Sequence, residues 1–245
     1  MKWKVFIPAL LLVFATACSQ SEEINAQTLV YDANAEVRKV EHFDGIEASG
    51  GMVVYIVQGK EQAVAVSAGD EKNVSRIKTE VRNGVLRIHP ESGAWNSWNW
   101  GNKSIKAYVT VTNLESLELN GAASVRVTGD LQVKALKMEV TGASSFKGSV
   151  KATSIQLEAT GASSVTLSGS VQNFYAEASG ASSIKAYDLT AETCEAEASG
   201  ASGISVTVTK EIKAEASGAS SIGYKGSASA TRIDASGASS IKKRD

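Results

Sequence analysis

The chain has little proline, cysteine or histidine, with two of each among 245 residues. Cys18 and Cys194 are too few and too far apart for a disulfide framework or a zinc site of the CxxC type. Positive charge is also not in excess, because 25 Lys and Arg stand against 26 Asp and Glu, and no basic stripe runs along the chain. Nucleic acid is therefore not an expected partner, and no cofactor is predicted. The 43% of hydrophobic residues is enough to build a core.

The first residues are typical of an export signal. Met1 to Lys4 carries positive charge, and Val5 to Ala15 is an apolar run of eleven residues, which fits a secretory signal and is too short to span a bilayer. The sequence Ala15-Thr16-Ala17-Cys18 resembles a bacterial lipoprotein signal, in which the cysteine is lipidated. We expect a signal peptide at 1–17 and a membrane anchor at Cys18. Ordinary secretion, with Cys18 lost in the cleaved peptide, is the alternative.

The residues after Cys18 are polar and acidic. Ser19-Gln20-Ser21-Glu22-Glu23 resembles the export tag of surface lipoproteins of Bacteroidota-type bacteria. A solvated stretch of this kind seldom folds by itself, so residues 18–35 are expected to form a tether. The predicted location is the outer membrane, with the folded part facing the periplasm or the outside.

A short motif, Gly-Ala-(Ala/Ser)-(Ser/Gly) followed by an aliphatic residue or Phe, recurs every 18 to 21 residues. It begins at Gly121, Gly142, Gly161, Gly180, Gly200, Gly218 and Gly237. The residues two and four positions before each glycine are almost all apolar, whereas the residue three before is Glu or Asp. This period of two is typical of strands. The glycine itself is expected at a corner with positive φ.

Strands that recur at this interval predict the coils of a solenoid, each pairing in parallel with its copy one coil later. The expected fold class is all-β: a single-stranded parallel β-helix of about 19–20 residues per coil. We expect right-handed winding from the rule for parallel crossovers. Corners are expected to absorb the variation in coil length. The regular coils should cover 114–245, after a more irregular β region at 36–113.

One outward column of the predicted stack is acidic. It consists of Glu118, Glu139, Glu158, Glu177, Glu197, Glu215 and Asp234, with Glu47 as a possible eighth member. Like charges one strand apart repel each other, so cations five positions before or after the corner glycine, or bound Ca²⁺, are expected to compensate them. We interpret the column as structural, a solvated charged face, and predict no metal site. A catalytic role is the alternative, but unlike carboxylates are needed for it, and His42 and His89 are the available imidazole bases.

The N-terminal region carries strand signals at Met52–Val57, Ala63–Val66, Val85–Ile88 and Tyr108–Val111, separated by turn residues. Its pattern Phe43-Asp44-Gly45-Ile46-x-x-Ser49-Gly50, then Val53-x-x-Ile56-x-x-Gly59, then Gly84-x-Leu86-x-Ile88, resembles the head GIN domain family of auto-transporter adhesins. The resemblance continues through the repeats to about residue 241. It implies a β-helical domain on envelope proteins, often lipoproteins, of Bacteroidota, and it implies no established ligand or catalytic residue.

The remaining candidate is a tryptophan-rich segment. Every tryptophan after the signal segment lies here, and the candidate binding residues are Trp95, Asn96, Trp98, Asn99 and Trp100. Flat aromatic rings interleaved with amides are suited to stacking on sugars and bonding their hydroxyls. The alternative is a segment that covers an open end of the solenoid. Cys194 falls in an inward column and is interpreted as a small buried hydrophobe.

The leading hypothesis is a non-enzymatic, lipid-anchored envelope protein, an adhesin-like module that binds a glycan or another envelope protein. A carbohydrate-active enzyme, such as a polysaccharide lyase or hydrolase, and a purely structural scaffold are the alternatives. The last predicted coil has charge as its visible cap, in Ile241-Lys242-Lys243-Arg244-Asp245. An unpaired strand edge there predicts an end-to-end homodimer.

Overall fold

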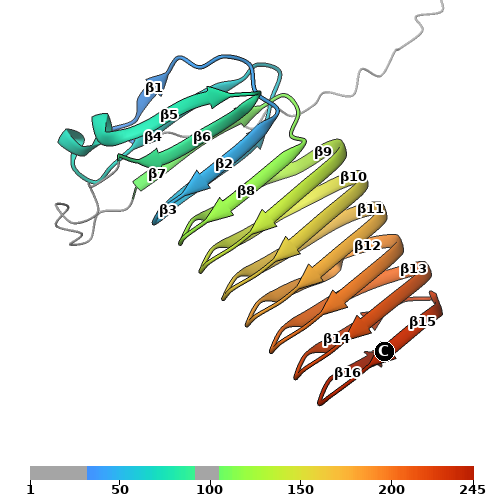
Figure 1. Cartoon of the computed structure of the whole chain (residues 1–245). Coiled ribbons are helices and arrows are strands. Elements are labelled where there is room, and N and C mark those ends of the chain that lie inside the picture. The colour runs from blue at the N-terminus through green and yellow to red at the C-terminus, as the bar shows by residue number, and fades with distance from the viewer. Residues whose placement is uncertain (1–31, 92–104) are drawn as a thin grey trace, which may run out of the picture.

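The computed structural model describes residues 32–91 and 105–245. Within these ranges, sixteen strands form one continuous sheet that winds into a solenoid, with a single short 3-10 helix, η1 (Glu71–Arg76). The all-β solenoid expected from the repeat is confirmed. The coils follow one another from the N-terminal strands to the last strand, and they wind in a right-handed sense along the chain (Figure 1).

The regular coils are built from long strands that bend around the solenoid. They are β9 (Ser124–Val140), β10 (Ser145–Ala159), β11 (Ser164–Ala178), β12 (Ser183–Ala198) and β13 (Gly203–Ala216). Each pairs in parallel with the next, and the last coil is made of β14 (Ser221–Lys225), β15 (Ser229–Ala235) and β16 (Ser240–Lys243). Each coil therefore has two arms, one before and one after its bend, which form the two opposite layers seen in Figure 1.

The corner glycines adopt the predicted left-handed conformation, with φ between 71° and 76° at all seven positions. Each corner stacks on the one before it through backbone hydrogen bonds, such as the Ala162 N–H donating to Gly142 O at 2.7 Å. A Cβ on Gly161 would lie 2.7 Å from that same oxygen. Glycine is needed at the corner for two reasons, the positive φ and the close approach of the next backbone.

The variation in coil length is absorbed within the strands and not at the corners, so this part of the sequence prediction is wrong. Register shifts lie between Lys147 and Ser149, Thr166 and Ser168, and Ala186 and Thr190. All lie at or near the bend of a coil, where a bulge costs one local hydrogen bond. The corners tolerate no insertion because the Gly-Ala-Ser backbone bonds directly to its copy in the coil before.

The N-terminal region begins the same solenoid and caps it. β2 (Gly45–Ser49) pairs in parallel with β8 (Ser116–Asn120), and β3 (Met52–Gln58) pairs in parallel with β9. β7 (Ile105–Val111) extends one layer by pairing in parallel with β3, and β6 (Val85–Pro90) extends the other by pairing in parallel with β2. The cap is completed by antiparallel strands: β4 (Ala63–Ser67) on β7, β1 (Glu36–Arg38) on β4, and β5 (Ile77–Arg82) on β6. The turn residues at 82–84 join two strands that pair directly, β5 and β6. The strand β4 pairs with β7 and β1, so the turn after β3 makes no hairpin.

One hydrophobic core runs from Phe43 in the cap to Ala228 in the last coil. In the inward column four residues before the glycine, the side chains become smaller along the stack, from Leu157 to Ala176 and Ala196, and all three are fully buried. Inward serines at the corners satisfy strand-end carbonyls, for example the Ser202 hydroxyl donating to Ala178 O at 2.8 Å. The last coil has no further coil of the described residues packed on it, so its part of the core is exposed; Ile233 is 42% accessible.

Candidate functional site

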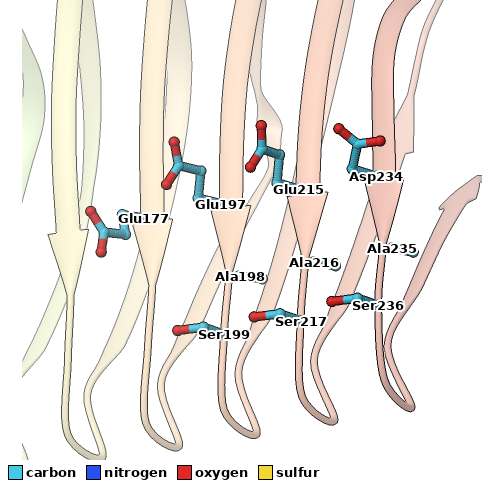
Figure 2. Close-up of a pocket in the computed structure, with 10 residues that line it drawn as sticks. All are labelled: Glu177, Glu197, Ala198, Ser199, Glu215, Ala216, Ser217, Asp234, Ala235 and Ser236. Carbon is cyan, nitrogen blue, oxygen red and sulfur yellow. The ribbon is translucent and has the colours of Figure 1, made fainter.

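The candidate site is a column of carboxylates on one layer of the solenoid, called here the acidic row. Its members pair in register from strand to strand along the whole stack: Glu47, Glu118, Glu139, Glu158, Glu177, Glu197, Glu215 and Asp234. Adjacent members are one strand spacing apart, about 4.8 Å. Figure 2 shows the last four, which extend from successive strands to the same outer side above Ser199, Ser217 and Ser236. These residues line a shallow depression of about 410 Å³.

Cations form ion pairs with the acidic row at both of its ends and near its middle. At the cap, Arg87 of β6 lies beside Glu47, with its Nε 3.0 Å from a carboxylate oxygen. At the last coil, Arg232 contacts Glu215 at 3.0 Å and Asp234 at 2.7 Å. Near the middle, Lys137 contacts Glu139 at 2.6 Å. All of these side chains are partly exposed, so each pair contributes little stability by itself, but together they offset the repulsion within the row.

Neutral donors take the place of cations on other strands. Gln156 donates to Glu158 at 3.1 Å, and the Tyr175 hydroxyl donates to Glu177 at 3.1 Å. Burial, together with the nearby negative charge of Glu177 and Glu197, raises the pKa of Tyr175 to about 12. Tyr175 therefore keeps its proton at neutral pH and acts as a donor to the row.

Compensation comes from the column five residues before the corner glycine and not from the column five residues after it. Arg126, Lys147 and Lys185 of the second column lie on the other arm of the coil, beyond the corner, and within the described ranges they form no ion pair. Among the described residues, no group of three or more His, Cys, Asp or Glu side chains is placed to hold a metal ion.

Glu197 is the member of the row with the least favourable setting. Partial burial, followed by the charges of Glu177, Glu215 and Glu195, raises the pKa of its carboxyl above the usual range. The neutral form is thus favoured in the folded state, so the folded protein is expected to lose stability as pH rises through the ordinary glutamate pKa and then the raised one.

We expect Glu197→Gln to raise the free energy of unfolding at pH 7 by about 0.5 kcal/mol, the scale of a like-charge pair across strands. The gain should fade as pH falls below the ordinary glutamate pKa. Urea unfolding of both proteins at several pH values measures it. Glu139→Gln is the matched control, because Glu139 is paired with Lys137 and its removal should bring no gain. Equal gains in the two variants would contradict this account.

The other predicted site residues fall into three groups. Cys18 and the segment with Trp95, Asn96, Trp98, Asn99 and Trp100 lie outside the described residues. Cys194 is 4% exposed in the inward column, as predicted, and burial raises the pKa of its thiol to about 12, which leaves it protonated and inert. His89 lies on β6, and its Nδ1 is 2.9 Å from the carbonyl oxygen of Pro90.

One cluster in the cap was missed by sequence reasoning. Lys106 of β7 contacts Asp32 at 2.9 Å, and the Ser67 hydroxyl donates to the same carboxylate at 3.0 Å. The hydrogen bond from Lys106 holds the pKa of Asp32 below its usual range. The cluster fixes the chain to the cap at residue 32. No local pattern predicts it, because the partners are separated by 35 and 74 positions.

Comparison with known proteins places this solenoid in a family. Residues 42–228 match the family described as "Putative auto-transporter adhesin, head GIN domain". The chain belongs to this family. The resemblance noted in the sequence is thereby confirmed. No curated protein matches the chain.

Solved structures share the fold of this head GIN domain protein. A "putative adhesin" from Bacteroides fragilis is 22% identical, with a TM-score of 0.78 over 86% of this chain and 96% of its own. A "putative lipid binding protein" from Parabacteroides distasonis is also 22% identical, with a TM-score of 0.65 over 87% and 98%. A "putative adhesin" from the same organism has 17% identity and a TM-score of 0.68 over 86% and 96%. At these identities the likeness shows the fold alone.

No helix among residues 32–91 and 105–245 is long and apolar enough to cross a membrane.

Proposed function

We propose that this head GIN domain protein is a non-enzymatic, adhesin-like binding module of the cell envelope, lipid-anchored at Cys18, with a glycan as its ligand. The observation that carries the proposal is the register of the coils. Outward side chains of one kind stand directly above one another from β2 to β15, as the acidic row does. A surface with this repeat suits a ligand that itself repeats, and a polysaccharide is such a ligand.

Two further features support a binding role. The members of the acidic row share one outward position on equivalent strands and repeat along the whole stack, a pattern that suits a repeating ligand better than a single catalytic pair. The ion pair of Lys106 with Asp32 fixes the start of the fold, and Cys18 precedes Asp32 by 14 positions (32 − 18), a length that serves as a tether from the membrane.

The test is binding to a glycan array by the full chain and by the variant Trp95→Ala, Trp98→Ala, Trp100→Ala. We expect the wild type to bind a neutral glycan and the triple variant to lose about tenfold or more in affinity, because aromatic stacking supplies much of the energy in sugar contacts. Tyr187→Ala is a control, since Tyr187 is an exposed aromatic residue on β12. The protein should leave polysaccharides intact.

Three outcomes would count against the proposal. Absence of wild-type binding would reject a glycan ligand. Equal binding by wild type and triple variant would reject the tryptophan segment as the contact. New reducing ends or unsaturated products after incubation with polysaccharides would favour the enzyme alternative.

A further inference from the structure

A second outward column lies on the layer of the solenoid opposite the acidic row. It runs in register from β3 through β12, and we call it the basic strip: Tyr55, Arg126, Lys147, Thr166 and Lys185. Arg126 and Lys147 are exposed and lie on adjacent strands, about 4.8 Å apart. The first part of the strip lines a groove of about 560 Å³ together with Ser124, Ser145 and Ser164.

In the part of the chain that the structure describes, the cations of the basic strip have no anionic partner. Several other cations of the coils are paired, such as Lys151 with Asp130 at 2.7 Å and Lys210 with Glu192 at 2.7 Å. Across the described ranges, Arg126, Lys147 and Lys185 form no ion pair with any carboxylate. An exposed row of unpaired like charges is repulsive, and a bound anion would remove that cost.

The strip is bordered by hydroxyl groups and ends on an aromatic ring. Ser124, Ser145, Ser164 and Ser183 form a parallel column beside it, and the Ser145 hydroxyl donates to the Ser124 hydroxyl at 2.9 Å. At the cap end, Tyr55 stacks on Tyr108 with ring centroids 5.4 Å apart and planes 13° from parallel. The stack holds the Tyr55 ring in place beside Arg126, its neighbour on the next strand.

We propose that the basic strip is a binding site for a linear acidic glycan, a polysaccharide with carboxylates repeated along its chain. The cations would pair with successive carboxylates, the serine column would bond sugar hydroxyls, and the Tyr55 ring would contact the apolar face of a sugar. The inference deepens the proposed function, because it rests on a glycan-binding role and adds a second site that takes acidic glycans.

The shape of the strip favours a linear glycan over an anionic membrane. The cations of the strip form one narrow column along the solenoid axis, bordered by small polar side chains. Membrane-surface binding also uses exposed apolar side chains that enter the bilayer. Among the described residues the exposed large hydrophobic side chains are Val37, Tyr187 and Ile233, and none of these belongs to the strip or lines its groove.

The test uses the full chain and a strip variant, Arg126→Ser with Lys147→Thr. These replacements are native to the column, where Ser205 and Thr166 already stand, so the fold should be kept. The matched control is Lys134→Thr with Lys213→Gln, which removes an equal number of positive charges from outside the strip; Gln156 shares the column of Lys213. Affinity for an oligogalacturonate is measured by calorimetry, with the same oligosaccharide reduced at its carboxyl groups as the neutral comparison.

We expect the wild type to bind the oligogalacturonate, and to bind the reduced form at least tenfold more weakly. The strip variant should bind the acidic form at least about tenfold more weakly than the wild type, since two charge-assisted hydrogen bonds are lost. The affinity of the control variant should change by less than about twofold. The affinity of the wild type should also fall with added salt more steeply than that of the strip variant.

Several results would overturn the inference. Equal losses in both double variants would show an effect of net charge alone. Absence of oligogalacturonate binding, with tryptophan-dependent binding of neutral glycans intact, would remove the strip and leave the proposed function in place, whereas absence of both would remove both. Strip-dependent binding to phosphatidylglycerol vesicles without glycan binding would assign the strip to a membrane surface instead.

Discussion

Gly161→Ala is expected to lower the free energy of unfolding by about 3 kcal/mol or more. The left-handed conformation at φ 73° costs an alanine about 1–2 kcal/mol. The new Cβ would also lie 2.7 Å from the Gly142 carbonyl oxygen, a backbone atom that is itself hydrogen-bonded to Ala162. The corner can relieve the clash only by weakening the contact between two coils.

The matched control for this corner is Gly203→Ser. Gly203 stands just after the corner motif, its φ is not positive, and the nearest atom to an added Cβ is the Ser221 hydroxyl at 3.6 Å. Serine already occupies the same column at Ser183 and Ser221. We expect a change within about 0.5 kcal/mol. Urea unfolding followed by circular dichroism compares the two, and equal stability of the variants would show that the corner is looser than its geometry indicates.

Leu157→Ala is expected to cost about 2–5 kcal/mol, the range for a leucine removed from a well-packed core. Leu157 is fully buried on β10, in register between Met138 and Ala176. The next coil already has alanine at this position, so the coil above cannot fill the space left behind. Because each coil contacts mainly its neighbours, the loss should separate the unfolding of the two halves of the rod.

Ile233→Ala tests whether burial, and not side-chain size, sets that cost. Ile233 lies in the same inward column but in the last coil, where 42% of it is accessible. We expect Ile233→Ala to lower the free energy of unfolding by less than about 1 kcal/mol, because the isoleucine side chain is only partly buried in the folded protein. Calorimetric unfolding of the two variants gives both numbers, and a larger cost for Ile233→Ala would contradict the assigned order of burial along the column.

The regular coils could be predicted from the sequence because their contacts repeat. Once the Gly-Ala-Ser motifs are aligned, the alternation of Leu157, Glu158 and Ala159 assigns inside and outside for every copy. Parallel in-register pairing then places each acidic residue above its equivalent. The positive φ at the corner was expected from the glycine that every copy carries there, because this conformation costs glycine least.

The cap could not be predicted in the same way, because its pairings are not repeated. Strands β4 and β7 are far apart in the chain and pair antiparallel, and nothing in the local pattern of either strand indicates its partner. The ion pair of Glu47 with Arg87 also could not be predicted, because it depends on the pairing of two strands that are far apart in the chain. Cations were expected to compensate the acidic row from the columns five residues before and five residues after the corner glycine. Only the position at which each coil turns decided that the first of these columns lies beside the row.

The sequence by itself determined the solenoid, its corners and the alignment of like side chains, because a short repeat imposes the same local geometry on every coil. The tertiary structure decided which arm each column lies on, where bulges absorb the differences in coil length, and which cations are paired. Those features depend on contacts between residues distant in the chain. The same folding that pairs Arg232 with the acidic row places Arg126 and Lys147 on the opposite layer, where no carboxylate of the described residues forms an ion pair with them.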